Sequence, residues 1–70
     1  MVEKTIELTG TSANSIEEAV NIAVSRAAVT IESIRNARVL EVNAAIDNGA
    51  VAQWRVKIAL SFVVQERLHE

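Results

Sequence analysis

The chain has 70 residues, half of them hydrophobic, no cysteine and a formal net charge of −2 at pH 7. This length allows a single domain, residues 1–70, and the lack of cysteine excludes disulfides and thiolate metal sites. Because acidic and basic residues are interspersed, the chain lacks the basic patch of a nucleic-acid-binding protein. The sequence has no signal-peptide pattern and no run of roughly 18 apolar residues for a membrane span, so we expect a cytoplasmic protein.

The first predicted element is a strand over residues 2–9. Val2, Ile6 and Leu8 alternate with polar residues there, and this period of two is typical of a half-buried strand. Gly10 follows the pattern. Because glycine adopts backbone angles that other residues avoid, we expect Gly10 at the corner after the strand.

A long helix is predicted next, beginning near Ile16 and ending at Arg35-Asn36. Two overlapping capping boxes mark its start, Asn14 with Glu17 and Ser15 with Glu18. Asn36 tolerates the left-handed conformation that often ends a helix. The stripe expected to face the sheet consists of Ile16, Ala19, Val20, Ala23, Ala27, Ile31 and Ile34.

Further apolar residues of this helix lie outside the stripe, namely Ile22, Val24, Ala28 and Val29. A helix that packs on one side only does not carry such residues on its other faces. A small core without disulfides also favours oligomerisation. We therefore expect a second buried contact, made with another subunit.

Two long strands are predicted at the end, over residues 37–47 and 51–64. Asn48-Gly49 between them is the strongest short hairpin signal. The even-numbered residues from Trp54 to Val64 are expected to face the helix as core. The other face, with Val39, Ala45, Ala59 and Val63 beside charged residues, is expected to form a subunit interface or a wet cavity.

The order of elements predicts an α+β fold, β-α-β-β, with a three-stranded antiparallel sheet. A single helix covers only one face of such a sheet.

One candidate site is acidic. Glu41, Asn43 and Asp47 share a face of the first hairpin strand, and their oxygen atoms suit calcium or magnesium. Successive residues on one face are about 7 Å apart, so a metal site needs ligands from another subunit. The alternative is that Glu41 forms ion pairs with Arg38, Arg55 or Lys57 of its own or an adjacent subunit.

A second candidate site is basic. Arg35, Arg38, Arg55 and Lys57 are suited to an anionic ligand such as a phosphate-bearing cofactor, or else to ion pairs with the acids. His69 is the only histidine and is expected to be solvated in the tail. Because no serine has a nearby histidine and no general acid–base pair stands out, we expect no enzyme activity.

This order of elements, with Leu8-Thr9-Gly10-Thr11-Ser12 and a hairpin that ends in Ser61-Phe62, resembles the dodecins over nearly the whole chain. The resemblance implies a three-stranded antiparallel sheet wrapped on one helix, and a hollow homododecamer with ligands between its subunits. It therefore implies a non-enzymatic protein that binds and stores a small molecule or ion.

Flavin, as FMN or riboflavin, is the ligand that the resemblance implies by default. The family pattern has a stacking Trp where this chain has Asn36, and a Gln where it has Arg55. Asn36 offers no π face for stacking. Arg55 offers only donors, whereas a Gln amide also accepts. Both cofactor-binding positions are thus substituted, which weakens flavin binding.

Residues 34–41 and 54–57 look more like a divergent dodecin subgroup that also lacks the stacking Trp and is linked to calcium. This resemblance implies a calcium or magnesium site with Glu41 as a metal ligand. A purely structural shell is the remaining alternative.

Overall fold

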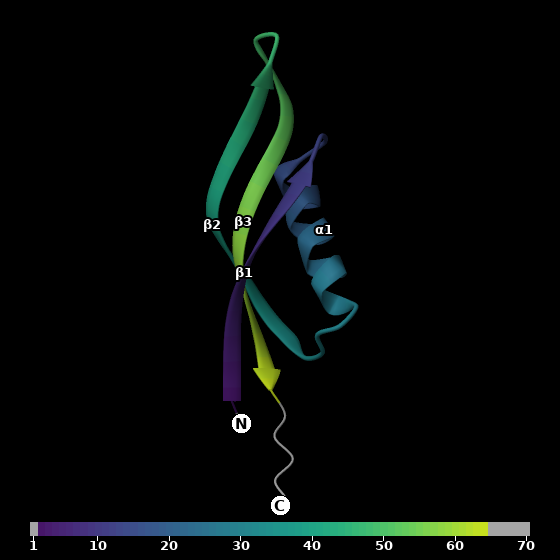
Figure 1. The fold of residues 1–70 in the computed structure, drawn as a ribbon, viewed down its shortest axis with the longest axis vertical. Coiled ribbons are helices and arrows are strands. Elements are labelled where there is room, and N and C mark those ends of the chain that lie inside the picture. The colour runs from purple at the N-terminus through teal and green to yellow at the C-terminus, as the bar shows by residue number, and fades with distance from the viewer. Residues whose placement is uncertain (1, 65–70) are drawn as a thin grey trace, which may run out of the picture.

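A computed structural model describes residues 2–64 of the chain. The elements are β1 (Val2–Ser12), α1 (Ile16–Ala28), β2 (Ile34–Asp47) and β3 (Ala50–Val64), and the strands form one antiparallel sheet in the order β1-β3-β2. Figure 1 shows α1 on one side of this sheet, with the β2–β3 hairpin continuing beyond the helix. The predicted β-α-β-β fold is confirmed. In the described part of the chain, no helix is long and apolar enough to cross a membrane.

The core lies between α1 and the central strand β3. Val56, Ile58 and Leu60 of β3 are fully buried, and Ala19 and Ala23 of α1 pack against them. The small alanine side chains allow the helix to approach the sheet closely. The prediction that even-numbered β3 residues face the helix is confirmed for these three; Trp54, Phe62 and Val64 are half-buried.

The predicted helix end is wrong, because α1 stops at Ala28 rather than at Arg35-Asn36. The next residues, Val29, Thr30 and Ile31, are β-branched and therefore weak helix formers. Ser33, with a φ of 60°, takes the left-handed conformation expected of Asn36. β2 consequently begins at Ile34 instead of residue 37.

The four residues outside the helical stripe differ in burial. Ile22 is half-buried. Val24 is half-buried and packs against the core, so the prediction that it lies outside the core-facing stripe is wrong. Ala28 is exposed, and Val29, just past the helix, is 80% exposed. These two remain apolar groups that nothing in residues 2–64 covers.

Gly10 does not form the predicted corner. It lies buried inside β1, which continues to Ser12, and it pairs with Val56. A Cβ at this position would overlap the backbone carbonyl oxygen of Ala19 and lie 3.0 Å from the Cβ of Ala23. Glycine is therefore needed where β1 and α1 touch, not for a turn.

The start of α1 confirms Ser15 as the N-cap but only half of the predicted Ser15–Glu18 capping box, because the Ser15 N–H donates to the Ser12 Oγ and not to Glu18. Ser15 is the N-cap, and its Oγ accepts a hydrogen bond from the backbone N–H of Glu18 at 3.0 Å. The Glu18 carboxylate accepts hydrogen bonds from the Ser12 hydroxyl at 2.5 Å and the Asn14 amide at 2.7 Å. These two hydrogen bonds, led by that from Ser12, lower the pKa of Glu18 from its usual value near 4.5.

A lowered pKa in the folded state makes stability depend on pH. The charged Glu18 stabilises the fold above its ordinary pKa, and this stabilisation is lost as the pH falls through the lowered folded-state pKa. We expect Glu18→Gln to unfold with a weaker acid dependence than wild type, as measured by urea denaturation between pH 3 and pH 6.5. Glu17→Gln, in the same helical turn, is the control; an equal reduction in both variants would contradict the prediction.

The hairpin turn is as predicted, with φ of 52° at Asn48 and 74° at Gly49. The pairing of β2 with β3 is interrupted by register shifts at three places: between Ile34 and Asn36, between Val39 and Glu41, and between Ala45 and Ile46. One extra residue in a strand reverses the face of the residues beyond it.

The shift at Leu40 corrects one prediction. Val39 pairs with Ile58 of the core, so it belongs to the helix-bearing face and not to the opposite face with Ala45, Ala59 and Val63. The same shift places Asn36 on the same face as Glu41. Asn36 pairs with Ser61 and Glu41 pairs with Lys57. These two partners lie four residues apart on one face of β3.

Candidate functional site

The face of the sheet opposite α1 carries the predicted site residues. Directly opposed residues of antiparallel strands point to the same side. Two adjacent rows across the sheet are therefore polar: Thr9, Lys57 and Glu41 in one, and Thr11, Arg55 and Asn43 in the other. We call this side of the sheet the open face.

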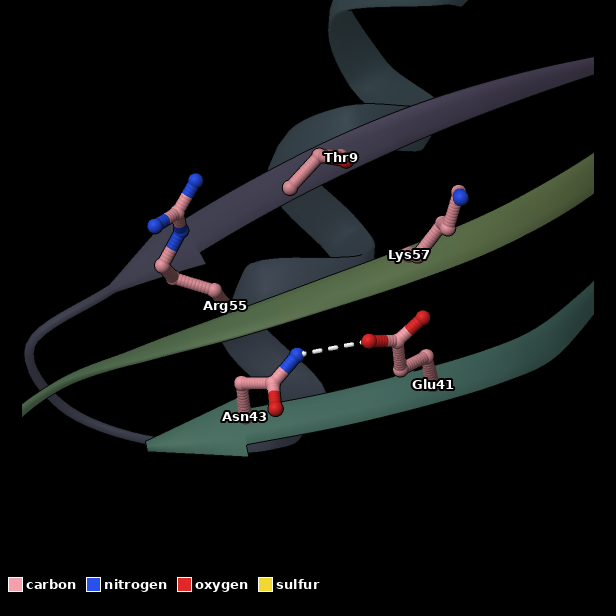
Figure 2. Close-up of a pocket in the computed structure, with 5 residues that line it drawn as sticks. All are labelled: Thr9, Glu41, Asn43, Arg55 and Lys57. Carbon is pink, nitrogen blue, oxygen red and sulfur yellow. Dashed lines mark hydrogen bonds between the residues drawn. The ribbon is translucent and has the colours of Figure 1, made fainter. Parts of the chain in front are cut away.

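A shallow hollow of about 250 Å³ lies over these rows and is lined by Thr9, Glu41, Asn43, Arg55 and Lys57. Figure 2 shows the five side chains on the three strands, with the helix behind the sheet. The hollow therefore opens away from the core. All five residues are exposed in this chain.

Glu41 and Asn43 form a pair over β2. The Asn43 Nδ2 donates a hydrogen bond to the Glu41 Oε2 at 3.0 Å (Figure 2). The bond leaves the other carboxylate oxygen and the Asn43 amide oxygen free to act as ligands. Both are the hard oxygen donors that calcium takes.

Within one subunit, the predicted ion pair between Glu41 and a neighbouring base is not present in residues 2–64. Lys57 lies opposite Glu41 in the register, but its Nζ is 3.6 Å from the Glu7 Oε1 on the other neighbouring strand. Glu7 was not predicted as a site residue. The alternation of residues in β1 indicates that Glu7 and Thr9 lie on one face of the strand.

Asp47, the third predicted acid, does not reach the hollow. It pairs with Ala50 next to the hairpin turn, six residues along β2 from Glu41. At about 3.3 Å per residue this separation is roughly 20 Å. No group of three His, Asp or Glu side chains suited to a metal ion occurs within residues 2–64.

Asn36 and Arg55, the substituted flavin positions, share the open face but lie far apart. Asn36 pairs with Ser61, and Arg55 is six residues from Ser61 along β3, again roughly 20 Å. One chain therefore cannot place both side chains against one flavin ring. A ligand that contacts both must bind between subunits.

The predicted basic cluster is also only partly assembled. Arg55 and Lys57 line the hollow together. Arg38 pairs with Ala59, one row beyond Lys57, and Arg35 lies at a register shift without a β3 partner. The sequence pattern missed Thr9, the β1 residue that completes the hollow.

Comparison with known proteins identifies the family of this chain. The dodecin family model matches residues 2–65. The chain belongs to the dodecin family. Calcium dodecin of Mycobacterium tuberculosis is 41% identical over 61 residues, which cover 87% of this chain and 86% of that protein.

Solved dodecins have the same fold. The crystal structure of M. tuberculosis calcium dodecin, described as having a novel calcium-binding site, matches with a TM-score of 0.83 and 36% identity over 100% of both chains. Streptomyces coelicolor dodecin matches with a TM-score of 0.89 and 34% identity over 93% of each chain. A variant of Thermus thermophilus dodecin matches with a TM-score of 0.89 and 31% identity, over 93% of this chain and 96% of that one.

Membership of the dodecin family means that the face with the hollow can contact another subunit. Dodecins are homo-oligomeric, small-ligand-binding proteins. An exposed face of one subunit is thus available for contact with another. The hairpin also exposes apolar side chains outside the hollow, as expected of a surface that other subunits cover. Val39, Leu40, Val42, Ile46 and Val51 are each at least 38% exposed in the single chain, and Val39 and Val42 lie on the helix-bearing face.

Proposed function

We propose that this dodecin forms a closed shell of twelve subunits that binds and stores calcium, with Glu41 as a ligand. The observation that carries the proposal is the Glu41 carboxylate, which has an amide but no cation as its partner within residues 2–64. The similarity to M. tuberculosis calcium dodecin supports the choice of ion.

The donors fit calcium in type but not in number. Calcium takes 6–8 oxygen ligands, whereas Glu41 and Asn43 leave about two oxygens per chain free of the hydrogen bond between them. Symmetry-related copies of this pair around a rotation axis, together with water, supply the remainder. The single subunit is thus expected to bind calcium weakly, and the assembled shell to bind it well.

Flavin storage is the less favoured function. Asn36 lacks the aromatic surface that stacks on an isoalloxazine ring, and Arg55 cannot accept the hydrogen bond of a ring N–H. We therefore expect riboflavin and FMN to bind weakly or not at all.

Calcium binding to the assembled protein tests the proposal. Isothermal titration calorimetry is expected to show saturable calcium binding to wild type, and Glu41→Gln is expected to raise the calcium Kd by about ten-fold or more, because affinity depends on the number of charged ligands. The glutamine keeps the shape of the side chain and removes its charge.

Glu3→Gln is the matched control, since Glu3 is an exposed carboxylate on the same face that pairs with Val63, three rows beyond Lys57. It should bind calcium as wild type does. Equal calcium affinity in Glu41→Gln and wild type would refute the role of Glu41. Sedimentation of wild type as a stable monomer would refute the shell.

A further inference from the structure

The charges that line the hollow are separated across the sheet. In Figure 2 the Arg55 and Lys57 side chains extend toward β1, while Glu41 and Asn43 lie together over β2. The hollow therefore has a negative side and a positive side. Calcium at Glu41 uses only the negative side.

Arg55 is the unexplained charge on the positive side. Its guanidinium makes no hydrogen bond or salt bridge with any residue between positions 2 and 64, whereas Lys57 forms the ion pair with Glu7 at 3.6 Å. Glu41 lies diagonally across from Arg55 in the ladder, within reach of long side chains. Arg55 nevertheless extends the other way, so the nearest acid does not neutralise it.

The neighbours of Arg55 on the open face are hydrogen-bond donors. Thr11 lies directly opposite Arg55 on β1, and Thr9 lies one row along, opposite Lys57. A planar guanidinium with five N–H donors, two hydroxyls and an ammonium match the several oxygens of a tetrahedral anion. The other cross-strand neighbour of Arg55 is Asn43, which is uncharged.

We propose that this positive side of the hollow, with Arg55 as the main donor, Thr9 and Lys57 in the lining and Thr11 opposite Arg55 on β1, binds a phosphate group. The phosphate is either free or the end group of a small phosphate monoester. The site goes beyond the proposed calcium function, and it does not require calcium or Glu41.

Phosphate titration of the assembled protein tests this site. The probes are inorganic phosphate and phenyl phosphate, added at low, constant ionic strength with chloride as the reference anion and a chelator to remove calcium. Binding is followed by ³¹P line broadening and by calorimetry. Arg55→Gln is expected to raise the Kd by about 10- to 100-fold, the range for losing hydrogen bonds to a charged group, and Arg55→Lys by less.

The controls separate this site from general charge and from calcium binding. Arg35→Gln removes the same charge from a position outside the hollow and should leave phosphate binding unchanged. Glu41→Gln should bind phosphate at least as well as wild type, because it removes a repulsive charge. Saturation by phenyl phosphate alone would assign an organic ester, and saturation by both probes would assign the phosphate group itself.

Three results would overturn the proposal. The first is no preference for either probe over chloride. The second is equal affinity in Arg55→Gln and wild type. The third is phosphate binding that appears only when calcium is added, which would mean that the anion is held by a metal at Glu41. Loss of calcium binding in Glu41→Gln with phosphate binding intact would support both sites separately.

Discussion

Gly10→Ala is expected to lower the free energy of unfolding by about 3 kcal/mol, the upper part of the usual range for overpacking a core. The added methyl group would overlap the Ala19 carbonyl oxygen and lie 3.0 Å from both the Ala19 carbonyl carbon and the Ala23 Cβ. The oxygen belongs to the helix backbone, so it cannot rotate away. The helix must therefore move off the sheet, which loosens its packing on Val56 and Ile58.

Gly49→Ala is the matched control. Gly49 has a φ of +74°, but no heavy atom lies within 4 Å of an added Cβ. The expected cost is about 1 kcal/mol, from the left-handed backbone alone. Urea denaturation of both variants at one protein concentration gives the comparison, because the stability of an oligomer depends on concentration. Equal losses in the two variants would contradict the close contact between β1 and α1.

The second large effect is expected from Asn36→Trp combined with Arg55→Gln. This variant should bind riboflavin about 10- to 100-fold more tightly than wild type. Two symmetry-related Trp residues that stack on one ring supply about 0.5–1.5 kcal/mol each, and the Gln amide can both donate and accept. Quenching of flavin fluorescence by the assembled protein measures the affinity.

The distance between the two positions makes this variant a test of assembly as well. Asn36 and Arg55 lie roughly 20 Å apart along the sheet, so they act on one flavin only between subunits. Asn21→Trp adds a Trp at an exposed position of α1 and controls for nonspecific quenching. Unchanged riboflavin affinity in the double variant would mean that these two positions do not line a flavin site in this chain.

The two proposed sites are expected to respond differently to one substitution. Arg55→Gln removes a positive charge near Glu41 and should leave calcium binding equal or stronger, while weakening phosphate binding. A single hollow with opposite charges on its two sides thus yields opposite responses to the same substitution. Ordinary unfolding would weaken both.

Local signals in the sequence were enough for the order and nature of the elements. Alternation predicted β1 and β3, the Ser15–Glu18 spacing predicted the start of α1, and Asn48-Gly49 predicted the hairpin turn. Each of these rests on residues a few positions apart, whose preferences hold in any context. The apolar surplus likewise indicated assembly, in agreement with a homo-oligomeric family.

The site was predictable only in part. The sequence singled out Glu41 and Arg55 as members of separate candidate sites, and the structure brings both into one hollow, without Asp47 or Arg35. Thr9 was missed, as was the ion pair of Lys57 with Glu7. These features depend on which β1 residue lies opposite which β3 residue, and no local pattern contains that register.

The sequence by itself determined the β-α-β-β order, the helix start, the hairpin and the buried side of β3, because short-range preferences decide them. Only the tertiary structure decided that α1 ends at Ala28, that Gly10 serves a helix contact, and that Leu40 shifts the register so that Asn36 and Glu41 share a face. The physical reason is that one extra residue in a strand costs little locally but reverses the side on which later residues lie. Pairing between distant segments therefore sets the chemistry of the open face.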